Sequence, residues 1–353
     1  MGLYRSAMKY GYSSTRTKAM ESKLIDVQTM KSIADARDID SILAILFQTD
    51  YNASIIKFGG QQISNTMLDF AISDNMTSRV NKLVEITPKD DKHILRKLIA
   101  RWDLNNVKMA LEAVDRKTPF DSISMYIISS GEFGQPVIKD IVKSENIDVA
   151  FAKLIHNRQY RGIMTKAYAA YKKNRNIMDA IAAIDAEHYR ELGELALELQ
   201  KGKHEKPALL LKLDIDMRNI ITLLRAKRNG MKIADVSARL IKNGSVETRI
   251  LTKIYNGSDD VASFASKITV FDLKNAIESY KGNGQMLSFE ISMRNQIFNI
   301  SDRMLRSSVL SLGVLVDYVY LKEIEVFTLR ALIKSKEYGL SKEEITRLVV
   351  WNL

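Results

Sequence analysis

The chain has 353 residues, enough for one large domain or two to three small ones with a sizeable core, so a mini-protein is excluded. Lys and Arg number 53 against 42 Asp and Glu, which gives a formal charge of +11. No cysteine is present, and this excludes disulfides, thiolate zinc sites, iron–sulfur clusters and cysteine nucleophiles.

Helices are predicted along almost the whole chain, because only four prolines occur and apolar residues recur at intervals of three and four. The first clear case is residues 32–51, and a second is residues 106–117. Loops are predicted at residues 59–60, 87–88, 131–136, 202–207 and 281–284, where Gly or Pro interrupts the pattern. The longest uncharged stretches reach about half of the ~20 residues that a spanning helix needs, so no transmembrane helix is expected. The predicted class is therefore all-α.

An internal repeat organises the chain. Residues 103–155 align without a gap with residues 216–268 at an offset of 113, and 11 of 53 pairs are identical where random pairing gives roughly three. These pairs are Asp103/Asp216, Asn106/Asn219, Leu111/Leu224, Ala113/Ala226, Ser124/Ser237, Ile128/Ile241, Gly131/Gly244, Ile141/Ile254, Phe151/Phe264, Ala152/Ala265 and Ile155/Ile268. The repeat therefore indicates that a helical unit has been duplicated.

A third copy of the unit appears on both sides of this pair. Ile33, Ile39, Asp40 and Leu46 match residues 141, 147, 148 and 154 at an offset of 108, and residues 219–231 match 328–340 at an offset of 109. Three homologous small helical domains of roughly 110 residues are therefore predicted, a period well above that of common helical repeats. The predicted boundaries are 1–31 for an N-terminal helix, then 32–143, 144–256 and 257–353. Three such units can close into a ring or cone, or leave an open arc.

Motifs for catalysis, cofactors and metals were not found. The chain has no GxxxxGK[ST] loop, no GxGxxG after a strand, no HExxH and no GxSxG. Its four histidines, at positions 93, 156, 188 and 204, are not paired at helical spacing. We therefore expect no catalytic residue, no cofactor and no metal site, and we do not expect an enzyme.

One acidic position recurs four residues before the first apolar residue of the repeated helix, as Asp103, Asp216 and Glu325. A carboxylate on a buried face has to be paired or hydrogen-bonded. Two interpretations stay open: an ion pair or cap between helices, or a polar contact that lines a cavity or a partner surface. The candidate structural or interface residues of the repeated helix are Asp103, Asn106, Asp216, Asn219, Arg225, Glu325 and Lys334. Thr328 replaces the asparagine in the last copy, and Glu112 replaces the basic residue in the first, so a charge-symmetric inner ring is not expected.

The positive charge is concentrated between residues 149 and 178, which contain seven basic residues and no acid. Nucleic-acid binding is one explanation, with Tyr160, Tyr168 and Tyr171 as candidate stacking residues. No nucleic-acid-binding motif accompanies the charge, however, and an acidic protein or anionic lipid headgroups would be served equally well.

The sequence resembles one known family at four places: YGYSSTRTKAMESKL at residues 10–24, LFQTDY at 46–51, RWDLNNVKMAL at 101–111 and EIEVFTLRALIK at 323–334. It is similar to the C subunits of archaeal and bacterial A-type ATP synthases, a family that includes the d subunits of eukaryotic vacuolar ATPases. The similarity runs the whole length of the chain. The absence of cysteine and the opening motif favour the prokaryotic type.

The resemblance implies a fold and a role. Three helical domains would form a pseudo-threefold funnel, a non-catalytic central-stalk subunit that links the soluble axle to the membrane rotor ring and couples ion flow to ATP synthesis or hydrolysis. The implied partners are axle subunits of the D and F type and the proteolipid ring, with anionic lipid headgroups as a further candidate and no nucleic acid. The implied location is the cytoplasmic face of the cell membrane, as a peripheral protein. The alternative is a basic all-helical scaffold that binds nucleic acid.

Overall fold

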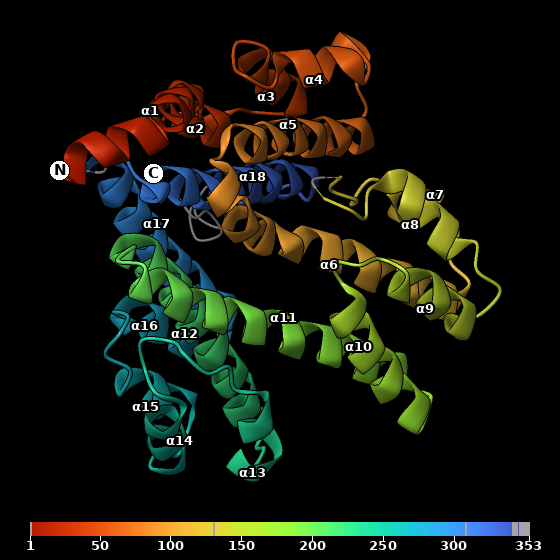
Figure 1. The fold of residues 1–353 in the computed structure, drawn as a ribbon, viewed down its shortest axis with the longest axis vertical. Coiled ribbons are helices and arrows are strands. Elements are labelled where there is room, and N and C mark those ends of the chain that lie inside the picture. Colours follow the sequence, from red (N-terminus) through yellow and green to blue (C-terminus); the bar gives the residue numbers. More distant parts are fainter. Residues whose placement is uncertain (1, 130, 308, 341–344, 346–353) are drawn as a thin grey trace. The chain divides into compact units, whose positions relative to one another are not determined.

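The computed structural model describes residues 2–129, 131–307, 309–340 and 345, and this part of the chain is all-α, without a strand (Figure 1). The chain divides into two compact units, one made of residues 1–49 and 193–353 and the other of residues 50–192. The helix α11 (Ile177–Lys201) contains the second boundary between them. The all-α prediction is confirmed. The pseudo-threefold funnel and the domain boundaries stay predictions, and residues 341–344 and 346–353 of the third predicted domain lie outside the described residues.

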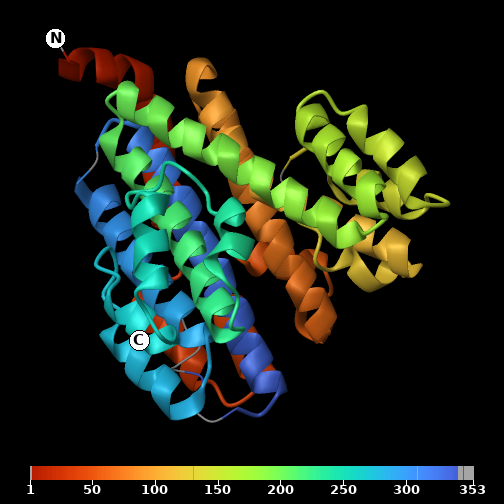
Figure 2. The same ribbon diagram turned by 90° about the horizontal axis from the view of Figure 1, so that it is seen from below.

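The unit of residues 50–192 is built around the long helix α6. Its elements are α4 (Asn52–Lys57), a 3₁₀ turn at Gly60–Gln62, α5 (Asn65–Ile86), a 3₁₀ turn at Lys89–Asp91, α6 (Lys92–Arg116), α7 (Asp121–Ser124), α8 (Gln135–Val142), α9 (Ile147–Ile155), α10 (Arg161–Asn174) and the start of α11. Figure 2 shows α8, α9 and α10 gathered in yellow and green at one end of this unit. Val107, Leu111 and Val114 of α6 lie in a core with Phe151 and Leu154 of α9, as the helical spacing of residues 106–117 predicts.

The other unit surrounds α18 (Leu312–Glu337), whose residues from Leu312 to Lys322 are all buried. A helix buried on every side is the centre of its unit, and α1, α3, α12 and α17 all contact it. The other helices of the unit are α1 (Gly2–Glu21), α2 (Val27–Asp35), α3 (Ile39–Leu46), the end of α11 from residue 193, α12 (Glu205–Arg228), α13 (Ile233–Val236), α14 (Thr248–Asn256), α15 (Val261–Ser266), α16 (Lys274–Asn283) and α17 (Leu287–Ser307), with a 3₁₀ turn at Ser237–Arg239.

The single helix expected over residues 32–51 is wrong, because the chain breaks between α2 and α3. Asp38 has an extended backbone, with φ −147°, and its carboxylate accepts the N–H of Ser41 at 2.9 Å. This N-cap satisfies a helix-terminal donor and starts a new helix at Ile39. Asn146 begins α9 and Asp260 begins α15 in the same way, each accepting an N–H three residues later. The loop expected at 281–284 is shorter than predicted, since α16 continues to Asn283.

The three long helices that carry the repeat end alike. Lys117, Gly230 and Gly339 have φ of 54°, 64° and 65°, the left-handed conformation that closes a helix. In each case the next N–H bonds to the carbonyl five residues earlier, at distances of 2.8, 3.0 and 2.9 Å. The helix α11 (Ile177–Lys201) ends in the same way, with Lys203 at φ 61° and the His204 N–H bonded to the carbonyl of Leu199 at 2.8 Å, so this terminus is not specific to the repeat.

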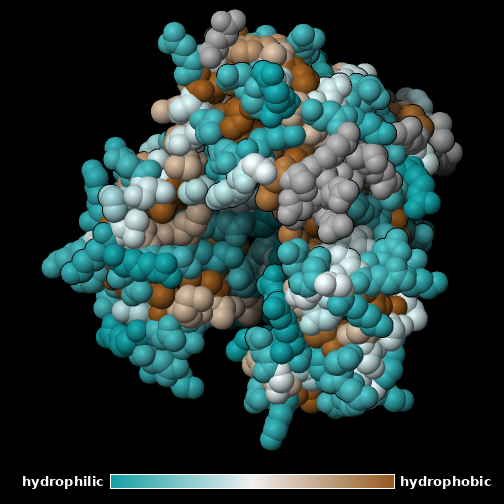
Figure 3. All heavy atoms as spheres, turned by 180° about the vertical axis from the view of Figure 1, so that it is seen from behind, coloured by the Kyte–Doolittle hydropathy of each residue, from teal (hydrophilic) through white to brown (hydrophobic). Residues whose placement is uncertain are grey.

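The protein surface in Figure 3 is mainly hydrophilic, with apolar residues interspersed. Within the described ranges, no helix combines the length and the apolar character that crossing a bilayer requires.

Candidate functional site

Asp103 lies on the buried side of α6 and holds the loop that follows this helix. Its carboxylate accepts the N–H of Glu132 at 2.8 Å and that of Phe133 at 2.9 Å, and the Tyr160 hydroxyl donates to it at 2.8 Å. Asp103 is 1% exposed. Burial raises the pKa of Asp103, and these three hydrogen bonds act in the opposite direction because they favour the charged form.

Asp216 occupies the equivalent place on α12. It is fully buried and accepts the N–H of Ser245 at 2.8 Å and that of Val246 at 3.2 Å. Burial raises the pKa of Asp216 to about 6, against the opposing effect of these hydrogen bonds. Both carboxylates therefore bind backbone N–H groups 29 and 30 residues further along the chain.

The asparagine one turn after each aspartate binds the same loop through both the N–H and the carbonyl of one loop residue. The Asn106 side chain donates to the carbonyl of Ile128 at 2.9 Å and accepts its N–H at 3.2 Å. Asn219 does the same with Ile241, at 2.9 and 2.8 Å. A side-chain amide carries one donor group and one acceptor in fixed geometry. It can therefore pair with the N–H and carbonyl of one residue, as a neighbouring strand would. Each Asp and Asn pair thus anchors its loop at two points.

A glycine completes each anchor. A Cβ atom at Gly131 would lie 2.1 Å from a carboxylate oxygen of Asp103, and one at Gly244 would lie 2.1 Å from Asp216. Only a residue without a side chain allows the backbone to pass this close. The identical pairs of aspartate, asparagine, isoleucine and glycine in the repeat are therefore the residues that build the loop anchor.

The third carboxylate, Glu325 on α18, binds the other end of the chain. Glu325 is fully buried and accepts the N–H of Ile25 at 2.6 Å and a hydrogen bond from Lys322 Nζ at 2.5 Å. At the offset of 108 between the first blocks, Ile25 is the counterpart of Phe133, whose N–H binds Asp103. The same contact therefore recurs a third time, with the loop supplied by the N-terminal segment.

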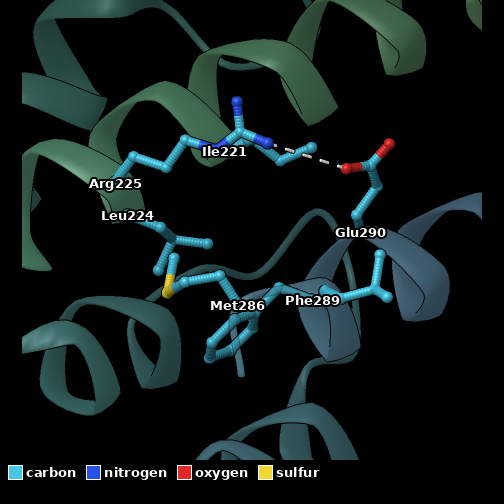
Figure 4. A pocket seen from close by; sticks show the side chains of 7 residues that line it. Ile221, Leu224, Arg225, Met286, Phe289 and Glu290 are labelled. Carbon is cyan, nitrogen blue, oxygen red and sulfur yellow. Dashed lines mark ion pairs between the residues drawn. The ribbon is translucent and has the colours of Figure 1, made fainter. Parts of the chain in front are cut away.

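The two basic candidates form ion pairs on their own helix or its neighbour. Arg225 Nη2 lies 3.9 Å from Glu290 Oε2 on α17, and Lys334 Nζ lies 2.7 Å from Glu337 Oε2 on α18. A pocket of about 120 Å³ lies between α12 and α17. In Figure 4 the side chains of Arg225 and Glu290 point toward each other among the residues that line it. Its lining residues are Ile221, Leu224, Arg225, Met286, Leu287, Phe289 and Glu290. For the seven candidate structural or interface residues of the repeated helix, contact with a partner stays a prediction.

The tyrosines of the basic stretch contact the protein itself. Tyr160 is 2% exposed and hydrogen-bonded to Asp103, so its ring is not available to a base. The Tyr168 hydroxyl donates to Asp148 at 2.9 Å, and Arg175, over the ring of Tyr171, pairs with the same carboxylate. The packing of these three residues is evidence against the stacking platform that single-strand binding needs.

A buried acid that the sequence reasoning missed lies at Asp317 in α18. Asp317 is fully buried, and within the described part of the chain neither of its carboxylate oxygens has a hydrogen-bond partner. The nearby Ser301 hydroxyl of α17 donates to the backbone oxygen of Asp317 at 3.5 Å. Burial raises the pKa of Asp317 to about 7, although Lys206 and Lys18 oppose the rise. The signal in the sequence was a single acid within the apolar run of residues 312–321.

Lys322, the buried partner of Glu325, was also missed. It is 1% exposed, three residues before Glu325 on the same helix. A lysine at this spacing from an acid is common on exposed helix surfaces, so the sequence alone gave no sign of burial. Among the residues that the structure describes, no group of three or more His, Asp or Glu side chains could hold a metal ion.

Fold and site together define a class: an all-helical protein of repeated units, in which buried carboxylates hold the loops of the protein's own chain. The family profile described as ATP synthase (C/AC39) subunit matches residues 13–348, and the chain belongs to this family.

Its relatives align over nearly their whole length. The A-type ATP synthase C subunit of Haloquadratum walsbyi is 23% identical over 338 residues, which is 95% of this chain and 96% of that protein. The protein of the same name from Thermococcus kodakarensis is 23% identical over 346 residues, 96% of this chain and 90% of its own. The V-type ATP synthase C subunit of Deinococcus radiodurans is 22% identical over 345 residues, 96% and 91% of the two chains.

Proposed function

We propose that the protein is a central-stalk subunit of an A/V-type rotary ATP synthase, which links the soluble axle to the membrane proteolipid ring without an active site of its own. The observation that carries this proposal is the family match over residues 13–348, with relatives named as the C subunits of ATP synthases that align over 96% and 91% of their length. The proposed partners are the D- and F-type axle subunits and the ring, and the proposed location is the cytoplasmic face of the membrane.

The internal contacts of the buried carboxylates support a structural part over a catalytic one. Asp103, Asp216 and Glu325 each accept backbone N–H groups from the protein's own loops. A general acid or base needs an oxygen within reach of a substrate proton, whereas these side chains are at most 1% exposed. Loops fixed to long helices are what a part that passes torque between two machines requires.

Deletion of the protein separates coupling from catalysis. Membranes from cells that lack the chain should lose ATP-driven ion uptake while their soluble fraction still hydrolyses ATP, and re-expression should restore uptake. Loss of hydrolysis by the isolated soluble complex would contradict a non-catalytic role. Full uptake in the deletion strain would contradict coupling.

Affinity purification of the tagged chain from gently solubilised membranes identifies the partners. Recovery of axle subunits and proteolipid, unchanged by nuclease, is the expected result. Nuclease-sensitive recovery from the soluble fraction would overturn the proposal in favour of the nucleic-acid scaffold.

A further inference from the structure

The N-terminal helix α1 (Gly2–Glu21) presents its bulky apolar side chains to solvent. Tyr4, Met8 and Tyr12 are 76%, 75% and 66% exposed. Residues four apart lie on one face of a helix, so the three side chains form a single row. Exposed apolar side chains are ordinary when scattered, but an ordered row on one face indicates a contact surface.

The opposite face of α1, which is buried, combines small polar residues with Tyr10 and Met20, which are 5% and 7% exposed. Ser13, Ser14 and Thr17 are at most 2% exposed, and α1 packs against α18. The hydroxyls of Ser13 and Thr17 donate hydrogen bonds to carbonyls of their own helix, at 3.2 and 2.7 Å. An ordinary surface helix buries its apolar stripe and exposes its polar face. α1 departs from this arrangement on its outer side, where its most exposed residues include Tyr4, Met8 and Tyr12.

The charge of α1 selects the kind of surface that the row would meet. From residue 2 to residue 20 the helix carries Arg5, Lys9, Arg16 and Lys18 and no acid. Lys9 and Arg16 are exposed, and at 100° per residue they fall on the flank of the apolar row beyond Tyr12. Lys18 pairs with Glu21 at 2.9 Å, at the end of the helix.

From these observations we propose that α1 lies on the surface of an anionic lipid bilayer, with Tyr4, Met8 and Tyr12 at the headgroup boundary and Lys9 and Arg16 toward anionic headgroups. Interfacial helices have this combination of a basic flank and an aromatic or aliphatic row, and tyrosine is enriched at the depth of the headgroups. Each basic residue near an anionic surface strengthens binding roughly fivefold.

An acidic protein is the competing occupant, and the dimensions of the row favour the bilayer. Tyr4 to Tyr12 spans about 12 Å of helix, and three side chains fall well short of the roughly 20 residues a side of a stable protein interface. A bilayer surface requires only a shallow row and nearby positive charge. This inference goes beyond the proposed function and does not depend on it.

The test is flotation of the purified full-length chain with vesicles of phosphatidylcholine alone or with about 30% phosphatidylglycerol, since an anionic surface is what the basic flank would recognise. We expect at least tenfold stronger binding to the anionic vesicles, weakening with salt. The triple variant Tyr4→Ser, Met8→Ser, Tyr12→Ser should lose at least tenfold in binding, and Lys9→Glu with Arg16→Glu should abolish the preference for anionic lipid. Met178→Ser is the matched control, because Met178 is 53% exposed in the other unit and should leave binding unchanged.

Two results overturn the proposal. One is the absence of anionic-vesicle binding by the wild type, and the other is equal binding by the wild type and the triple serine variant, each with folding checked by circular dichroism. Co-purification of the same variants with other ATP synthase components is the parallel measurement. Loss of co-purification without vesicle binding would assign α1 to an acidic protein partner instead, whereas failure of the wild type to co-purify contradicts the proposed function alone.

Discussion

Replacement of the buried carboxyl group of Asp317 is expected to stabilise the protein in a pH-dependent manner. Below the usual carboxyl pKa of 3.8, both folded and unfolded chains hold the proton. Between 3.8 and about 7 the unfolded chain releases it while the folded chain keeps it, so stability falls as pH rises, and above 7 the loss is complete. Each pH unit in this interval is worth about 1.4 kcal/mol.

The full loss in the free energy of unfolding amounts to about 4 kcal/mol, and the part lost between pH 5 and pH 8 is about 2–3 kcal/mol. Asp317→Asn keeps the size of the side chain and does not titrate, so the variant should gain this amount over the wild type between the two pH values. The measurement is urea unfolding followed by far-UV circular dichroism at pH 5, 6, 7 and 8. The control for removal of one negative charge is Asp235→Asn, because Asp235 is exposed on α13 in the same unit.

Two outcomes would refute the reasoning about Asp317. An advantage of Asp317→Asn that is equal at pH 5 and pH 8 would show that the carboxyl does not titrate in this range. A variant less stable than the wild type at pH 8 would mean that the folded protein holds the charged form in a favourable environment.

Three further predictions concern the loop anchors. Gly131→Ala should lower the free energy of unfolding by about 1–3 kcal/mol, because its Cβ atom would meet the Asp103 carboxylate. Gly162→Ala is the control, since its new methyl group meets no atom of the described residues within 4 Å. Equal melting temperatures of the two variants would disprove the close approach of Gly131 to Asp103. Asn106→Ala should cost about 1–3 kcal/mol, because three backbone groups, the N–H and carbonyl of Ile128 and the carbonyl of Phe133, lose a partner. An unchanged unfolding midpoint in urea would contradict the anchor. Glu325→Gln should cost about 3–5 kcal/mol because it removes the carboxylate charge that pairs with buried Lys322. Adding Lys322→Met should recover part of the loss, and an additive double variant would exclude the coupling.

The helical class and the repeated helix could be predicted from the sequence because both leave local signals. The apolar spacing of residues 106–117 corresponds to the buried face of α6, and the identical pair Gly131 and Gly244 marks the two loop anchors. Why these residues are identical could not be read from one chain, since the reason is a contact with a carboxylate nearly 30 positions away.

Other features were out of reach because tertiary packing decides them. Asp38 ends one helical pattern and starts another through a single side-chain cap, which the apolar spacing of residues 32–51 does not reveal. The apolar run of α18 does not say which side its acid faces, because a helix buried all round has no polar side. Glu325 has its partner at Ile25, before the repeat rather than after it, so a search downstream of α18 could not find it.

The contact between Ile25 and Glu325 joins positions 300 residues apart and gives the protein an order of assembly. During synthesis, α2 and α3 leave the ribosome long before α18, the helix that α3 packs against. At 5–20 residues per second, the N-terminal segment waits roughly 15 to 60 s for its carboxylate. The unit of residues 50–192 is continuous in sequence, whereas the unit of residues 1–49 and 193–353 cannot be completed before α18 has emerged.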